Sequence, residues 1–163
     1  MMKASSHSVI NAPVDRIDLA AWLQIFSDRD YQACSPGHRA AGCFREKDQF
    51  GTINVENVGG HLLVHHYLAD VFTAPRVVLW SRDTRVYLLH LWPATIDVCW
   101  IMDVQAGDGE TTVFTCTVEV RTSPVLSALA RLCLLPTFLR RHVVGETPLF
   151  AADIARKIRE ARL

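Results

Sequence analysis

The last third of the chain, residues 123–163, constrains the fold more than any other stretch. If one helix continues through Pro136 and Pro148, its apolar face recurs every three or four residues, at Leu135, Leu139, Val143, Glu146, Phe150, Ile154 and Ile158. Ser123 is suited to the N-cap and Pro124 to the first helical position, while basic residues near the end complement the helix dipole. A helix with such a face needs a concave apolar surface on which to pack.

Composition limits the choice of partner. The chain has 163 residues, enough for one domain, 1–163, with a substantial core. Half of the residues are hydrophobic, 21% are charged, and the formal net charge is zero. Because a neutral chain has no overall attraction for polyanions, we expect neither nucleic acid nor a membrane as a partner. The apolar runs are far shorter than the roughly 18–20 residues that span a bilayer, and residues 1–8 contain no hydrophobic signal region.

The cysteines indicate a reducing compartment. There are five, Cys34, Cys43, Cys99, Cys116 and Cys133, an odd number without close pairs. We therefore expect reduced thiols in the cytoplasm.

The expected order of elements is strand, helix, loop, sheet, helix. A short strand at 7–11 precedes a helix at 14–26 and a loop at 28–38. Strands are expected at 39–45, 51–58, 61–68, 76–81, 85–92, 95–104 and 111–122, with a hairpin at Gly107-Asp108-Gly109. The fold class predicted is α+β, a curved antiparallel sheet wrapped around the terminal helix.

This order resembles the helix-grip fold of the Bet v 1 and START-like superfamily, also called SRPBCC or polyketide cyclase-like. The local cues are residues 10–16 (Ile-Asn-Ala-Pro-Val-Asp-Arg), Asp30-Tyr31, and residues 150–154 (Phe-Ala-Ala-Asp-Ile). The resemblance covers essentially the whole chain. It implies a cavity between sheet and terminal helix for a hydrophobic or aromatic small molecule, but it does not identify that molecule, because one fold hosts many functions.

Two of the expected strands have a clear inner face. Alternation directs Ile96, Val98, Trp100, Met102 and Val104 inward, and likewise Phe114, Cys116, Val118 and Val120. Core packing alone would account for any of them. Trp100 and Met102 are best suited to contact a ligand, because an indole offers a flat face and a thioether adapts to irregular shapes. The predicted ligand-binding residues are Trp100, Met102, Phe114, Cys116, His90, Phe150 and Ile154.

Histidines supply the candidate acid–base groups. His61 and His65 share one face of a strand, and His66 points to the other. His90 lies in an expected strand whose two faces are too similar to orient. A surface or structural role is the commoner one for a single histidine. An inward His65 or His66 is a candidate catalytic acid or base, since imidazole titrates near neutrality.

His142 and Glu146 have metal-ligand spacing. Four residues apart on a helix, they share a face, and Glu146 falls on the apolar stripe, where an unpaired carboxylate is costly. A divalent metal such as zinc would compensate it. The alternative is that the helix breaks at Gly145 or Pro148 and leaves Glu146 in solvent.

This pair resembles one in diacetylphloroglucinol hydrolase-type members of the superfamily, zinc enzymes that cleave a carbon–carbon bond in an acylated phenol. The resemblance implies a metal site with a His-x-x-x-Glu pair from the terminal helix and a His and a Glu from the sheet side. His38 is the nearest match for that histidine, and Asp70, shorter than the family's Glu, for that carboxylate. The metal would polarise a carbonyl or lower the pKa of a bound water, with His65 or His66 carrying a proton.

Two function classes stay open. The first is a binding module that carries a hydrophobic or aromatic molecule unchanged. The second is an enzyme, either a zinc-dependent hydrolase or a metal-free cyclase or dehydratase, with an aromatic or polyketide-like substrate. Convergent histidine and carboxylate groups would favour chemistry, and an apolar lining would favour carriage. A cysteine nucleophile, Cys34 or Cys116, is a further alternative, and the oligomeric state is open, a dimer included.

Overall fold

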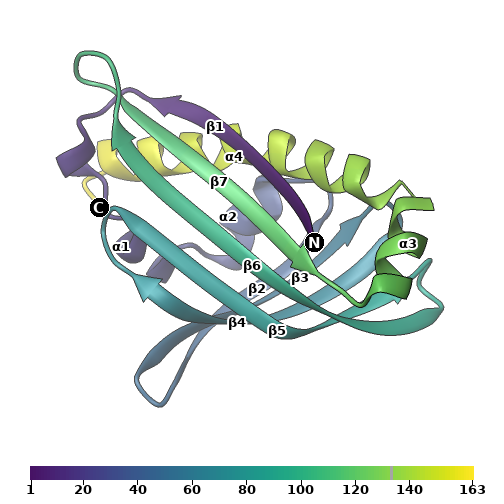
Figure 1. Cartoon of the computed structure of the whole chain (residues 1–163). Helices are drawn as coiled ribbons and strands as arrows, with labels where there is room; N and C mark the ends of the chain where they lie inside the picture. Colours follow the sequence, from purple (N-terminus) through teal and green to yellow (C-terminus); the bar gives the residue numbers. More distant parts are fainter. Residues whose placement is uncertain (133) are drawn as a thin grey trace.

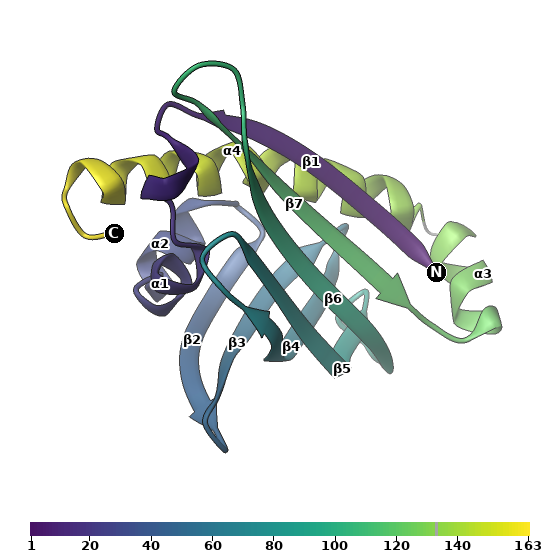
Figure 2. The same ribbon diagram turned by 60° about the vertical axis from the view of Figure 1, so that its left-hand side comes forward.

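Within residues 1–132 and 134–163, the part of the chain that the computed structural model describes, seven strands form one antiparallel sheet. The sheet order is β1-β7-β6-β5-β4-β3-β2, and the sheet curls around the long helix α4 (Figures 1 and 2). The strands are β1 (Met2–Ile10), β2 (His38–Glu46), β3 (Gln49–Val58), β4 (His61–Phe72), β5 (Arg76–Leu88), β6 (Trp92–Ala106) and β7 (Thr112–Arg121). The predicted α+β helix-grip architecture is confirmed.

Helix α4 (Leu135–Arg159) is the central packing element. It continues through Pro148, and the predicted face is confirmed, since Leu139, Val143, Glu146, Phe150, Ile154 and Ile158 are buried. The prediction of one helix from residue 123 is wrong at its start. Leu134 takes a left-handed conformation, φ 56°, and separates α3 (Pro124–Leu132) from α4. Ser123 caps α3, because its Oγ accepts a hydrogen bond from the Leu126 N–H at 3.3 Å.

The segment between β1 and β2 is more helical than the sequence indicated. A 3-10 turn η1 (Val14–Arg16) and helix α1 (Leu19–Gln24) replace the single helix expected at 14–26, and the expected loop contains α2 (Asp28–Ala33). Asp18 starts α1 by accepting a hydrogen bond from the Ala21 N–H at 2.8 Å. Ser27 and Asp30 form a capping box that starts α2. Together α1 and α2 lie at the opposite end of the sheet from α3 (Figure 2).

The strand faces predicted for β6 and β7 are confirmed. Met102 and Phe114 are fully buried, and Trp100 is 4% exposed. The strands expected at 76–81 and 85–92 are instead one strand, β5, with a register shift between Ser81 and Thr84. The chain then turns at Leu89 and His90, both with positive φ.

Two further features can be compared with the sequence analysis, namely the state of the cysteines and the length of the helices. Cys34, Cys43, Cys99 and Cys116 are free, and Cys133 lies outside the described residues. Across the described residues, the helices fall short of the length and apolar character that crossing a bilayer requires.

The turn between β3 and β4 offers a test of the fold. Gly59 and Gly60 have φ of 58° and 81°, and a Cβ at Gly59 would lie 2.6 Å from the Phe138 ring, whereas one at Gly60 would meet open space. We expect Gly59→Ala to lower the free energy of unfolding by about 2–4 kcal/mol and Gly60→Ala by about 1 kcal/mol, because only the first adds a clash to the backbone strain. Denaturant unfolding of both variants measures this. Equal losses would contradict the packing of Phe138 on the turn.

Candidate metal centre

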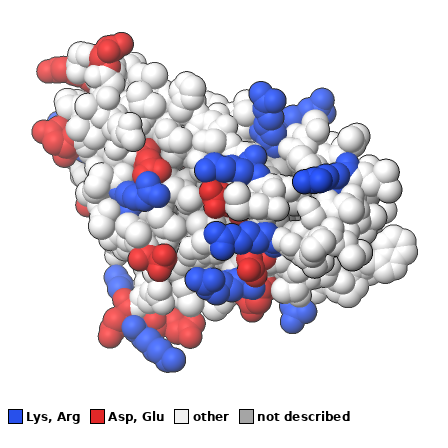
Figure 3. All heavy atoms as spheres, viewed as in Figure 1, with Lys and Arg blue, Asp and Glu red and all other residues white. Residues whose placement is uncertain are grey.

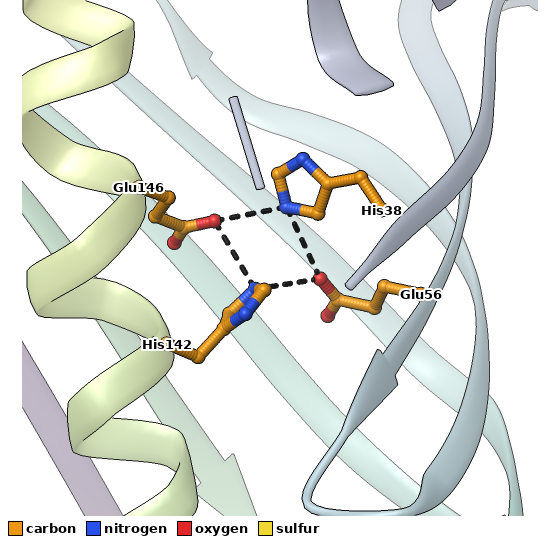
Figure 4. Close-up of side chains that lie close together, drawn as sticks. All are labelled: His38, Glu56, His142 and Glu146. Atoms are coloured by element: carbon orange, nitrogen blue, oxygen red, sulfur yellow. Dashed lines mark hydrogen bonds and ion pairs between the residues drawn. The ribbon is translucent and has the colours of Figure 1, made fainter. Parts of the chain in front are cut away.

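Four side chains of metal-binding type meet between the sheet and α4. His38 begins β2, Glu56 lies in β3, and His142 and Glu146 project from neighbouring turns of α4 (Figure 4). One ligand atom from each residue lies within 4.8 Å of the others. Two histidine nitrogens and two carboxylate oxygens thus face one another.

The contacts within this cluster alternate between histidine and glutamate. Nε2 of His38 lies 3.1 Å from Oε2 of Glu146 and 3.6 Å from Oε2 of Glu56. Nε2 of His142 lies 2.9 Å from Oε2 of Glu56 and 3.2 Å from Oε2 of Glu146. Each carboxylate therefore has a histidine on either side.

Burial and charge act in opposite directions at this cluster. Burial alone would raise the pKa of Glu56, but the charge of His142 and hydrogen bonds from His142 and His65 hold that pKa well below its usual range. Burial would also raise the pKa of Glu146, yet His142 and a hydrogen bond from His38 lower it. For His142, burial favours a lower pKa, but Glu56 and Glu146 raise the pKa to about 11. The two carboxylates thus favour a positive charge between them.

A second layer of hydrogen bonds orients the cluster. Nδ1 of His38 donates to the backbone carbonyl of Tyr31 at 2.6 Å, which turns Nε2 toward the glutamates. The Tyr31 ring stacks on His38 with centroids 3.8 Å apart. The Tyr31 hydroxyl donates to Oε2 of Glu56 at 3.3 Å, and Nε2 of His65 lies 2.9 Å from Oε1 of Glu56. Helix α2, through Tyr31, therefore fixes the sheet-side half of the cluster.

A small cavity adjoins these side chains. Its volume is about 20 Å³, and its lining consists of Tyr31, Asn54, Glu56, His65, Tyr67, Trp100, Val118, Leu139, His142 and Glu146. Such a volume holds a water molecule or an ion. An aromatic ligand would need the surrounding side chains to move.

Three of the four residues assigned to the metal site from sequence lie together, and one does not. His38, His142 and Glu146 belong to the cluster. The alternative in which the helix breaks and exposes Glu146 is wrong, since α4 is continuous there and Glu146 is 4% exposed. Asp70 must be corrected, because it is exposed on the outer face of β4, and Glu56 takes its place.

The candidate acid–base histidines separate in the same way. Strand β4 buries His61, Leu63, His65 and Tyr67, so His65 faces the cavity. His66 points to the outer face, where it is exposed and stacks on Phe44 with centroids 4.8 Å apart. The assignment of His66 as a catalytic candidate is therefore corrected, and His65 keeps that position.

Among the predicted ligand-binding residues, Trp100 lines the cavity. Its Nε1 donates to Sγ of Cys116 at 3.2 Å. His90 is corrected, because it is exposed in the β5–β6 turn. The remaining predicted residues are buried in the core and do not line this cavity: Met102, Phe114, Cys116, Phe150 and Ile154.

Sequence reasoning missed Glu56, Asn54, Tyr31 and Tyr67. A signal for two of them was present in 51–58, where Thr52, Asn54, Glu56 and Val58 alternate onto one face. In the structure Asn54 pairs with His65 and Glu56 with Leu63. Orienting that strand against the inner face of β4 would have directed Glu56 inward.

Comparisons with known proteins show the fold. No protein-family model and no curated protein matches the sequence. A protein from Thermus thermophilus has 13% identity and a TM-score of 0.63, with 98% of both chains covered. The ZhuI aromatase/cyclase from Streptomyces sp. R1128 has 15% identity and a TM-score of 0.61, covering 98% of this chain and 96% of its own.

A START superfamily protein from Mycobacterium smegmatis has 10% identity, a TM-score of 0.52 and coverage of 99% of both chains. These likenesses confirm the START-like, polyketide cyclase-like helix-grip fold that the order of elements predicted.

Proposed function

We propose that this helix-grip protein is a zinc-dependent hydrolase that acts on a carbonyl group of an aromatic or polyketide-like small molecule. The observation that carries the proposal is the convergence of two histidine nitrogens and two carboxylate oxygens within 4.8 Å. Two carboxylates away from water repel each other and lose hydration. A site that gathers both around one point is therefore suited to a divalent cation.

The chemistry of the donor atoms fits zinc. Imidazole nitrogen and carboxylate oxygen are both ordinary zinc ligands, and the residues that would hold the ion are His38, Glu56, His142 and Glu146. The hydrogen bond from His38 Nδ1 to the Tyr31 carbonyl is the kind of outer contact that orients a ligating histidine. When bound, zinc supplies Lewis-acid polarisation of a carbonyl and lowers the pKa of water.

The neighbouring residues would handle protons and developing charge. Hydrolysis adds the hydroxyl of water to the carbonyl carbon, breaks the bond to the leaving group and gives that group a proton. His65, on the cavity wall and 2.9 Å from Glu56, is the residue placed to pass this proton. Burial, with the charges of Glu56 and Glu146, raises the pKa of Tyr31 and Tyr67 well above the usual value, so both hydroxyls stay protonated. The Tyr31 hydroxyl donates to Glu56, whereas the Tyr67 hydroxyl is the donor on the cavity wall for a substrate oxygen.

The test joins metal binding to turnover. Chelator-treated protein is titrated with Zn²⁺ by calorimetry, native mass spectrometry gives the stoichiometry, and a panel of acylated phenols and aryl ketones is assayed with and without the metal. We expect one ion per chain and metal-dependent hydrolysis of at least one class of compound. A protein that takes up no divalent ion would refute the proposal, and zinc binding without hydrolysis of any compound in the panel would remove its catalytic half.

A second function, the binding of an apolar molecule without transformation, is favoured by the lining of a separate cavity of about 30 Å³, which would have to widen by movement of its side chains to admit such a molecule. It lies between α3 and the sheet, and its walls are almost wholly apolar, formed by Met2, His61, Val86, Leu88, Ala94, Ile96, Val120, Thr122, Leu126, Leu129, Ala130 and Leu135. An apolar lining of this kind favours carriage over chemistry.

Filling this cavity should block such binding. We expect Ala130→Phe to lower the affinity for the fluorescent probe N-phenyl-1-naphthylamine about tenfold, because Ala130 is buried on the cavity wall. Ala128→Phe is the matched control, since Ala128 lies on the same helix but outside the cavity wall. Fluorescence titration gives both dissociation constants, and equal affinities in the two variants would place the probe elsewhere.

A further inference from the structure

Large apolar side chains crowd one end of the molecule. We call this surface the apolar pole: Leu89 and Leu91 on the β5–β6 turn, Trp92 at the start of β6, and Val125, Leu129 and Leu132 on α3. Leu91 is 70% exposed, Trp92 63%, Val125 82% and Leu132 80%. Single exposed apolar side chains are ordinary, but a cluster drawn from two separate elements marks an interaction surface.

The two halves of the pole are neighbours in space. The cavity beneath α3 has Leu88 and Ala94 from the flanks of the turn on one wall and Leu126 and Ala130 from α3 on another. Figure 1 shows α3 at one end of the sheet, beside the N-terminus and away from the C-terminus. The turn and the helix therefore present their apolar side chains at the same end.

The charges close to the pole are mainly basic, although Asp97 lies opposite Arg121 where β6 pairs with β7. Residues 120–145 contain Arg121, Arg131, Arg140 and Arg141 and no Asp or Glu, and residues 84–96 contain Arg85 and no acid. In Figure 3 the end of the molecule that carries α3 shows basic and uncharged residues but no acidic ones. The chain is neutral overall, but this end carries a local excess of positive charge that can attract an acidic membrane, the partner that net charge alone excluded.

We propose that the apolar pole docks on the surface of a lipid bilayer that contains anionic lipids. In this arrangement Leu91, Trp92 and the outer residues of α3 enter the interface while the arginines stay among the headgroups. Apolar side chains beside basic ones are the combination that binds such surfaces, and an indole is suited to the boundary between apolar and polar layers. Each arginine held near an anionic surface raises partitioning about fivefold.

The composition of the pole favours lipid over a protein partner. A protein interface carries about one hydrogen bond per 100–200 Å² and so needs directed polar groups. Of the six side chains that define the pole, only that of Trp92 has a hydrogen-bond donor, and five are aliphatic. Aliphatic side chains can enter a bilayer interface without hydrogen-bonding groups placed opposite them.

Docking would also give the cavity beneath α3 a role. That cavity lies directly behind the helix that faces the lipid. If it holds an apolar molecule, as the second function proposes, the molecule passes between bilayer and protein without crossing water. The docking itself requires neither the metal centre nor this cavity.

The experiment uses extruded vesicles of phosphatidylcholine alone and with about a third phosphatidylglycerol. Trp92 is the natural reporter, because it is 63% exposed, whereas Trp22 is fully buried and Trp100 is 4% exposed. The fourth tryptophan, Trp80, is half-buried beneath Arg82 and Arg121. We expect cosedimentation with the anionic vesicles, a blue shift of tryptophan emission, quenching by brominated lipid, and weaker binding at high salt. Trp92→Phe should still bind but lose most of the shift.

Paired charge substitutions locate the surface. Leu91→Glu with Trp92→Glu, and separately Val125→Glu with Leu132→Glu, should lower the partition coefficient by roughly tenfold or more, since each places two carboxylates in the interface. The matched control is Val9→Glu with Val144→Glu, which adds the same charge at side chains 58% and 49% exposed outside the pole. It should lower binding by less than about threefold.

Three results would overturn the proposal. The first is a wild-type protein that does not bind anionic vesicles at low salt. The second is an equal loss in the pole variants and in the control. The third is a dimer in solution that becomes monomeric in the Leu91 and Trp92 variant, which would assign the pole to a second copy of the chain.

Discussion

Replacing His142 and Glu146 together by alanine will remove zinc binding, because this change deletes two of the four donors and both that α4 supplies. Loss of an outer hydrogen-bond partner alone typically lowers metal affinity about 10- to 100-fold, and loss of two ligands should cost far more. Calorimetry and native mass spectrometry of the double variant against the wild type measure the change. Unaltered zinc content would eliminate the site.

The controls separate ligation from position in the fold. Asp70→Ala and His66→Ala change residues of the same chemical types that lie exposed on the outer face of β4, and both variants should bind zinc like the wild type. Glu56→Gln keeps the shape of the side chain but removes the carboxylate charge that the sheet supplies to the site. It should weaken zinc binding as strongly as the loss of a donor on α4, His142 or Glu146. Circular dichroism of each variant shows whether the fold is retained.

The same cluster predicts an order of stability without metal. His142→Ala alone leaves Glu56 and Glu146 without the positive charge that lies within 3.2 Å of both. The double variant also removes Glu146 and leaves Glu56 with His65 at 2.9 Å and Tyr31 at 3.3 Å. Because an uncompensated buried charge is the costly state, we expect the single variant to unfold more easily than the double.

The helix half of the site could be predicted because helical spacing is local. Positions 142 and 146 share a face whatever the rest of the chain does, and the apolar stripe around Glu146 indicated that this face is buried. The sheet half depends on which face of each strand points inward. Asp70 has the parity of His66, which faces outward, whereas Glu56 has that of Val58, which is buried. Orienting β3 and β4 together would have been needed, and the sequence analysis assigned an inner face to neither of them.

Some features of the fold could be predicted from local sequence patterns, and others that also had a local signal were missed. Alternation in β6 and β7 predicted their inner faces, because the long strands carry many apolar residues on one side. The helix break at Leu134 was missed although Pro136 signalled a helix start, since proline fits the first turn of a helix better than its interior. The capping box of Ser27 and Asp30 is likewise visible in the sequence, whereas the prediction placed a loop at 28–38, where α2 begins.

Replacing Asp153 by alanine should cost the most stability of any change considered, about 3–5 kcal/mol in the free energy of unfolding. Lys157 is fully buried, and its Nζ lies 2.7 Å from Oδ2 of Asp153 and 3.1 Å from Oδ2 of Asp30. Nε1 of Trp22 also donates to Oδ2 of Asp153, at 2.8 Å. The variant leaves a buried ammonium with one carboxylate instead of two and an indole without its acceptor. Denaturant unfolding at neutral pH measures the loss.

A double variant tests whether the buried charge is the cause. Asp153→Ala with Lys157→Met removes the ammonium together with its partner, so it should recover much of the stability lost in Asp153→Ala. Glu160→Ala is the surface control, because Glu160 pairs with Arg156 in solvent and should change stability little. No recovery in the double variant would mean that lost packing, rather than unpaired charge, explains the effect. Since this network joins α1 and α2 to α4, and α2 carries Tyr31 against His38, Asp153→Ala should also weaken zinc binding without removing a ligand.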